Sequence, residues 1–148
     1  MPSKDSIHDP VKLSFQRSGW QITADPYVIS YGERFLFVDL GAESVIIGAE
    51  QDNIRIAIEI KALRGRSIMA ELEQAIGQYV LYQILLTEVD PERILYLAIT
   101  TQTYNELFQE PIGQLVLKAL PLRLVVVDIT SQEITQWIPQ PFAKPSNK

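Results

Sequence analysis

A pair of carboxylates with a lysine beside them is the combination in this sequence best suited to chemistry. Glu59 and Lys61 stand two residues apart at the end of segment 53–61, and Asp39 lies near the end of an earlier apolar segment. Carboxylate oxygens bind hard cations such as Mg²⁺, and a neighbouring lysine orients or deprotonates an attacking water. The ordinary alternative is a solvated Glu-x-Lys pair, which many proteins contain by chance. These residue types therefore suggest a metal site. The site requires that the surrounding strands bring the three side chains together.

The segments that carry these residues have the pattern of β-strands. Isoleucines occupy positions 54, 56, 58 and 60, and this period of two predicts a strand with one buried face. Glu59 and Lys61 fall together on the other face. Residues 34–41 predict a second strand that ends in Asp39 and a turn at Gly41. If the two strands are neighbours, the three charged side chains meet, and burying them without partners would cost free energy.

The remaining pattern predicts a mixed sheet with helices on both sides. A helix is expected over residues 6–18, with short strands at 20–23 and 27–30. Strands at 35–40, 45–50 and 54–61 follow, joined by hairpin turns at 41–43 and 51–53. A central helix at 67–87 precedes an apolar strand at 94–100, helices at 104–108 and 112–120, a strand at 122–128 and a closing strand at 133–138. The fold class is α/β (α+β), with a core order α-β-β-β-α-β-α-β.

Composition fits one folded domain over residues 1–148, with its core at about 4–138 and a proline-containing tail at 139–148. Apolar residues make up 47% of the chain and charged residues 21%, which is typical of a globular protein. The absence of cysteine excludes disulfides and thiolate metal sites. The sequence contains neither an apolar run of membrane-spanning length nor a signal-peptide core near its start, so a soluble, cytoplasmic protein without membrane association is expected. The net charge of −5 argues against strong DNA binding by the chain alone.

Several short motifs along the chain resemble one family. They are Lys4-Asp5, His8-Asp9, Gly19-Trp20-x-Ile22-Thr23, Asp25-Pro26, VDLGAE at 38–43, AIEIK at 57–61, Gly77-Gln78, PERILYLA at 91–98, Glu110-Pro111 and Gln136-Trp137-Ile138. Together they resemble the XisH family, the cyanobacterial fdxN element excision controlling factors, within the PD-(D/E)xK nuclease-like superfamily. The resemblance runs from Lys4 to Ile138. Val38 stands where the superfamily motif has a proline.

The resemblance implies a restriction-endonuclease-like fold and a role for each site residue. Asp39 and Glu59 would bind Mg²⁺, or Mn²⁺ in its place, with the backbone carbonyl of Ile60 as a third oxygen. Lys61 would orient the attacking water, or else only pair with a carboxylate. Gln78, on a helix that is otherwise apolar, would steady the carboxylates or bind a phosphate; its alternative is a hydrogen bond to a backbone carbonyl.

The first helix offers accessory candidates. Many nucleases of this superfamily add an acidic residue from that helix, which Asp9 or Asp5 would supply, and His8 is the chain's only histidine. Both residues also suit the start of a helix, where capping is their ordinary role. Asp25, before Pro26, is interpreted as a turn residue.

Two hypotheses of function follow from the resemblance. In the first, the chain is an accessory factor for programmed excision of a DNA element, acting beside a site-specific recombinase and an XisI-like factor. Its catalytic activity, if present, would be that of a Mg²⁺-dependent DNA endonuclease. In the second, the chain is a non-catalytic module that keeps the fold and binds the XisI-like partner. A homodimer would raise its otherwise weak affinity for DNA.

Overall fold

A six-stranded mixed sheet forms the centre of the computed structural model, which describes residues 6–44, 53–65, 67–120 and 122–139. In spatial order, the strands are β1 (Trp20–Ala24), β4 (Leu40–Ser44), β5 (Arg55–Ile60), β6 (Ile94–Thr100), β7 (Leu124–Asp128) and β8 (Glu133–Ile138). The β5–β6 and β6–β7 pairs are parallel, and the other pairs are antiparallel. The predicted α+β class, a mixed sheet flanked by helices, is confirmed.

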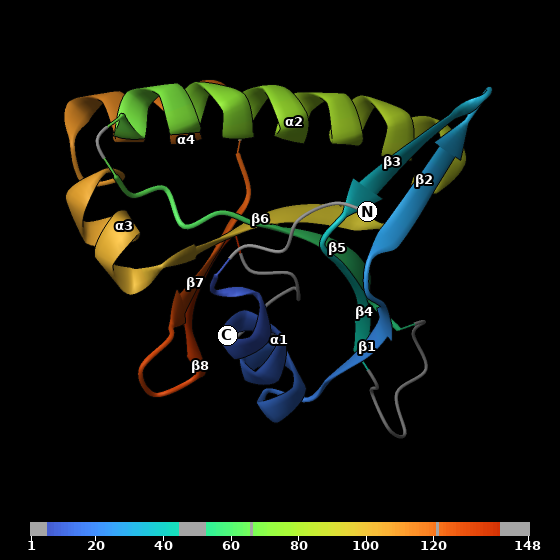
Figure 1. The fold of residues 1–148 in the computed structure, drawn as a ribbon, viewed down its shortest axis with the longest axis horizontal. Coiled ribbons are helices and arrows are strands. Elements are labelled where there is room, and N and C mark those ends of the chain that lie inside the picture. Colours follow the sequence, from blue (N-terminus) through green and yellow to red (C-terminus); the bar gives the residue numbers. More distant parts are fainter. Residues whose placement is uncertain (1–5, 45–52, 66, 121, 140–148) are drawn as a thin grey trace, which may run out of the picture.

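Helices cover both faces of this sheet (Figure 1). They are α1 (His8–Arg17), α2 (Ile68–Val89), α3 (Thr101–Glu106) and α4 (Pro111–Ala119). On one face, α2 packs on Ala57 and on alternate residues of β6. On the other face, Val11 and Phe15 of α1 pack on the isoleucines of β5. Because both faces are covered, β5 is buried on its Glu59 side as well as on its isoleucine side.

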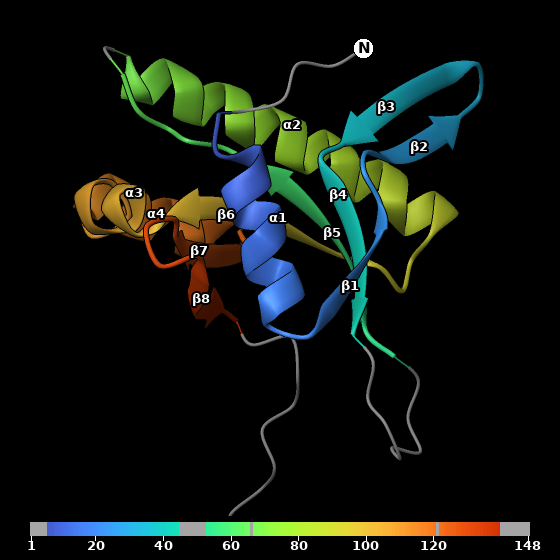
Figure 2. The same ribbon diagram turned by 60° about the horizontal axis from the view of Figure 1, so that its bottom comes forward.

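A separate hairpin of β2 (Tyr27–Tyr31) and β3 (Arg34–Val38) stands beside the sheet (Figure 2). It contacts α2 and packs closely on β4: a Cβ added at Gly41 would lie 2.9 Å from Cδ1 of Tyr27. The predicted single strand at 35–40 is therefore wrong, because the chain leaves β3 at Val38 and enters β4 at Leu40. The predicted hairpin turn at 41–43 is also wrong, since these residues lie within β4 and pair with β1 and β5.

Most other predicted elements are present with shifted ends. The central helix, predicted at 67–87, runs from Ile68 to Val89, and the two short helices lie at Thr101–Glu106 and Pro111–Ala119. Thr100 begins α3, because its side chain accepts a hydrogen bond from the Thr103 amide. The strand predicted at 45–50 and most of the tail lie outside the described residues. In the part of the chain that the structure describes, no helix is long and apolar enough to cross a membrane.

Two helical glycines provide a test of this packing. In α4, a Cβ on Gly113 would lie 2.6 Å from Phe108 Cα and 2.9 Å from Leu107 C, whereas a Cβ on Gly77 of α2 would meet nothing within 4 Å. Gly113→Ala should therefore destabilise the protein by about 1–3 kcal/mol through overpacking. Gly77→Ala should stabilise it by about 0.5–1 kcal/mol through helix propensity. Urea unfolding of both variants measures the two effects, and equal effects would contradict the close contact of α4 with the end of α3.

Candidate functional site

Asp39 and Glu59 are brought together by the register of two strands. β4 and β5 pair with Leu40 opposite Ile58, so the next residue outward, Asp39, faces Glu59. Oδ2 of Asp39 accepts a hydrogen bond from the Ile60 amide at 2.8 Å. In return, Oε1 of Glu59 accepts one from the Asp39 amide at 3.3 Å. Each carboxylate is thus held against the backbone of the other strand, as the two-strand hypothesis required.

Glu59 is buried and Asp39 is half-buried, and this changes the ionisation of both carboxylates. Only 5% of Glu59 is exposed. Burial raises the pKa of Glu59 to about 8, and the negative charge of Asp39 acts in the same direction. Burial also raises the pKa of Asp39, against the opposing effects of the Ile60 amide and of the charges on His8 and Lys61. The pair therefore favours a shared proton or a bound cation over two free negative charges.

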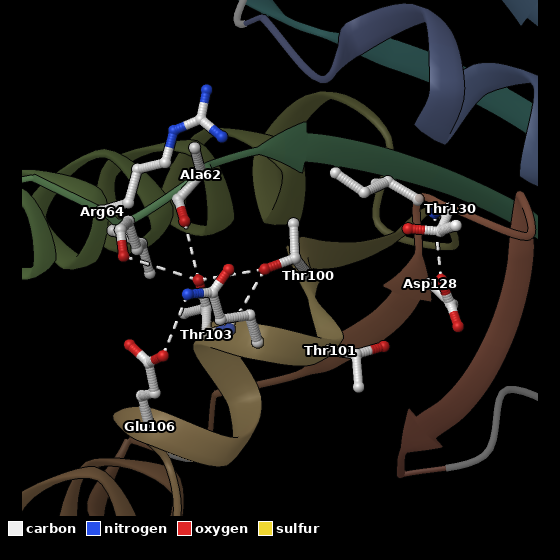
Figure 3. Close-up of a pocket in the computed structure, with 11 residues that line it drawn as sticks. Ala62, Arg64, Thr100, Thr101, Thr103, Glu106, Asp128 and Thr130 are labelled. Atoms are coloured by element: carbon white, nitrogen blue, oxygen red, sulfur yellow. Dashed lines mark hydrogen bonds between the residues drawn. The ribbon is translucent and has the colours of Figure 1, made fainter.

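Lys61 lies beside the pair at the end of β5. Its Nζ is 3.5 Å from Oε2 of Glu59, which is the contact that its alternative role, pairing with a carboxylate, requires. Hydrogen bonds join Lys61 and the residue after it to the sheet and to α3. The Lys61 amide donates to Ala98 O at 3.0 Å. Thr103 Oγ1 donates to Ala62 O at 2.7 Å (Figure 3). These bonds fix where β5 ends, and with it the position of the Ile60 carbonyl and the lysine.

A cavity of about 240 Å³ opens next to this segment (Figure 3). It lies at the carboxyl ends of the parallel strands, between Arg64, the start of α3 and the turn after β7. Crevices at such strand ends commonly hold ligands in α/β proteins. Neither Asp39 nor Glu59 lines this cavity.

His8 is buried and is oriented by Asp25, across the loop between β1 and β2. Its Nε2 lies 3.0 Å from Oδ1 of Asp25, and Lys12 Nζ donates to Oδ2 at 2.7 Å. Burial alone would raise the pKa of Asp25, but the hydrogen bonds from Lys12 and His8 outweigh it, so the pKa lies below its usual value. An ionised carboxylate only accepts hydrogen bonds, so Nε2 carries the proton. Nδ1, buried and without a partner in the described structure, is left available to a further group.

Gln78 and Tyr82 project from the same side of α2, one turn apart. The Tyr82 hydroxyl donates to Phe37 O at 3.2 Å, just before Asp39. Burial raises the pKa of Tyr82 to about 12, and the charges of Glu59 and Asp39 add to the effect. Oε1 of Gln78 is buried and has no hydrogen-bond partner in the described structure. The expected contact of Gln78 with the carboxylates or with a backbone carbonyl would be donated by its amide nitrogen, Nε2, and stays a prediction.

The structure separates the two candidates from the first helix. Asp9 is exposed in the first turn of α1, whereas His8 is buried and hydrogen-bonded to Asp25. Asp5 lies outside the described residues. The interpretation of Asp25 as no more than a turn residue was incomplete, because it accepts hydrogen bonds from His8 and Lys12. The spacing of four between Gln78 and Tyr82 could have identified the tyrosine. Nothing in the sequence marks the pairing of His8 with Asp25, seventeen residues away.

The donor set suits one divalent cation with an incomplete protein shell. No group of three or more His, Asp or Glu side chains in the described residues is placed to hold a metal ion. The protein would thus supply two carboxylates, with the Ile60 carbonyl, water or phosphate oxygens completing the shell. Mg²⁺ is commonly held in this way, by one or two carboxylates together with waters and substrate phosphates.

Comparison with known proteins identifies the family of this chain. The family model of the XisH protein matches residues 1–135. The chain belongs to the XisH family. The crystal structure of an XisH family protein from Nostoc punctiforme is similar, with 33% identity and a TM-score of 0.80 over 90% of this chain and 98% of that one. That of an fdxN element excision controlling factor protein from Anabaena variabilis has the same identity and TM-score, covering 91% of this chain and 99% of its own. No curated protein matches.

The XisH match spans every residue of the candidate site, from His8 to Tyr82. The site is therefore built wholly from the part of the chain that defines the family. Its two carboxylates, its lysine and its oriented histidine come from three segments that the fold brings together: α1, the junction of β3 and β4, and the end of β5.

The raised pKa of Glu59 predicts an unusual dependence of stability on pH. The folded protein keeps this proton up to about pH 8, whereas the unfolded chain, with a pKa near 4.5, releases it earlier. The unfolded state therefore binds fewer protons between these values, and stability falls as pH rises through this window. Glu59→Gln should remove most of this fall and stabilise the protein at pH 8 by on the order of a few kcal/mol.

Denaturant unfolding between pH 5 and about 8.5 measures this effect. Glu133→Gln, at an exposed carboxylate of β8, is the matched control and should keep the wild-type slope. If Glu59→Gln kept the same slope as the control, Glu59 would not be protonated in the folded state, and the account of the buried pair would fail.

Proposed function

We propose that this XisH-family protein is an accessory factor for excision of a DNA element, and that it provides a nuclease-like site for a divalent cation. The excision role is supported by the similarity to the fdxN element excision controlling factor of Anabaena variabilis. The cation site is supported by one observation above all: the buried carboxylate of Glu59 and the half-buried carboxylate of Asp39 face each other, and the pKa of each is raised. A divalent cation would neutralise this pair and remove the penalty of its burial.

The reaction that best suits this arrangement is hydrolysis of a phosphodiester, as in the PD-(D/E)xK superfamily. Asp39 and Glu59 would hold Mg²⁺ or Mn²⁺, which polarises a phosphoryl oxygen and favours deprotonation of a bound water. Lys61, whose Nζ lies 3.5 Å from Oε2 of Glu59, would orient the attacking water. His8, with Nδ1 as the available atom, would accept a proton, and the hydrogen bond to Asp25 would hold its ring for this role.

DNA would reach this site with the help of the cation and of partner proteins. The chain carries 13 basic and 18 acidic residues, so its own field repels phosphate. A site-specific recombinase and an XisI-like factor are the proposed partners that bring the DNA. The bound cation would offset the local negative charge where the phosphate must approach.

The first test is titration of Mn²⁺ into the protein by calorimetry. Saturable binding is expected for the wild type. The Asp39→Asn, Glu59→Gln double variant should weaken it by at least about tenfold, because both charged ligands are lost. Glu133→Gln, on exposed β8, is the matched control and should bind like the wild type. Binding that survives in the double variant, or binding absent from the wild type with and without DNA, would contradict the cation site.

A second candidate role is a non-catalytic one, in which the protein binds the XisI-like factor and contributes no cutting. The net charge of −5 favours this role, since it opposes phosphate binding by the chain alone.

Excision activity and partner binding separate the two roles. If the site is catalytic, Asp39→Ala and Glu59→Ala should each reduce excision by a factor of about 100 or more while pull-down of the XisI-like factor is unchanged. Glu133→Ala should leave both measurements unaltered. Excision that persists in folded Asp39→Ala and Glu59→Ala variants would establish the non-catalytic role and contradict the first proposal.

A further inference from the structure

The outer face of α2 is apolar and open to solvent. The inner face of the helix contributes Leu72, Ala75, Tyr79, Tyr82 and Leu86 to the core. On the outer side, Val80, Leu81 and Ile84 are 38%, 46% and 58% exposed, and we call these three residues the α2 ridge. The helix carries no charged residue between Glu73 and Glu88. A helix at a protein surface normally has charged residues on its outer face, so the α2 ridge has the composition of a covered surface.

A hollow lies on each side of the α2 ridge. One, of about 440 Å³, separates it from the β2–β3 hairpin and is lined by Tyr31, Phe35 and Leu85, among others. The other, of about 350 Å³, separates it from Leu120 and Arg123, beyond α4. Phe35 is 64% exposed at the edge of the first hollow. The face therefore presents a projecting apolar ridge and two recesses beside it.

We propose that this face binds a second copy of the chain across a two-fold axis that passes near the α2 ridge. A two-fold interface uses the same patch on both copies, so the patch must fit itself. The α2 ridge with its flanking hollows meets this requirement, because the ridge of each copy can enter a recess of the other. Helices pack against one another in this way, with the ridges of one seated in the grooves of the other.

The charges around the face also match a second copy. Arg34 and Arg123 border the two hollows, and Glu73 and Glu88 are exposed at the ends of the uncharged stretch. None of the four forms an ion pair within the described part of the chain. Free charges of both signs thus surround an uncharged centre, which is a self-complementary arrangement. Away from this face, two copies that each carry a charge of −5 would repel one another.

The association is independent of the cation site, and a charge placed on the α2 ridge tests it. The wild type should show a concentration-dependent dimer in sedimentation equilibrium over about two decades of concentration. Ile84→Glu should raise the dimer dissociation constant by at least about 30-fold, because the new charges would be buried at the centre of the interface. Leu13→Glu is the matched control: Leu13 is 39% exposed on α1, across the sheet, and this change should leave the dimer intact. Circular dichroism and thermal melting check that both variants fold.

The absence of cysteine allows a second, direct measurement. Ile84→Cys should form a disulfide-linked dimer under mild oxidation, since two-fold symmetry brings the two copies of position 84 together. Leu13→Cys should stay monomeric on a non-reducing gel at the same protein concentration. A wild type that is monomeric throughout, or a dimer that Ile84→Glu leaves intact, would overturn the proposal. So would a monomer that captures the XisI-like factor through the α2 ridge, because the face would then belong to a different partner.

Discussion

The removal of two facing carboxylates from solvent, Glu59 fully and Asp39 in part, is the constraint on which the rest of the site depends. Neither carboxylate has a guanidinium partner, and the single lysine contacts only Glu59 in the described structure. Two amide hydrogen bonds, one from each strand, hold the pair in place but do not neutralise it. The packing of the sheet around the pair must offset the free-energy cost of this burial. A bound cation would reduce that cost. Such a cost is typical of a site kept for binding or chemistry rather than for stability.

The division of the chain at Asp39 makes this arrangement possible. Residues 34–44 supply two successive strands to two different sheets, and Asp39 is the one residue between them. Because it is not paired in a ladder, its side chain can reach the Ile60 amide while its own amide bonds to Glu59. The β2–β3 hairpin contacts α2, and the Tyr82 hydroxyl of α2 donates a hydrogen bond to the carbonyl of Phe37 in β3, two residues before Asp39. The division of the chain at Asp39 therefore positions both the carboxylate pair and the hairpin and tyrosine beside it.

Local patterns predicted the parts of the site that one strand defines, and missed those that packing defines. The isoleucine alternation placed Glu59 and Lys61 correctly, because side-chain direction in a strand follows from the sequence alone. It did not predict that the face of β5 that carries Glu59 would also be buried, since that depends on where α2 packs on the sheet. The division at Asp39 was missed because no glycine or proline separates the residues of β3 from those of β4 at this point of the sequence. The His8–Asp25 pair was missed because it depends on α1 lying across the β1–β2 loop.

An acidic protein with a buried carboxylate pair has a particular consequence for how cation and DNA would bind. Without the cation, phosphate would approach a negative site on a chain of charge −5. With it, each phosphate oxygen that enters the shell would strengthen cation binding, because the protein supplies only two side-chain ligands. The two affinities would therefore be linked, and by reciprocity each ligand would raise the affinity for the other by the same factor. Under the proposed function, such coupling would confine DNA engagement to complexes in which the metal, the strand and the partner proteins are assembled together.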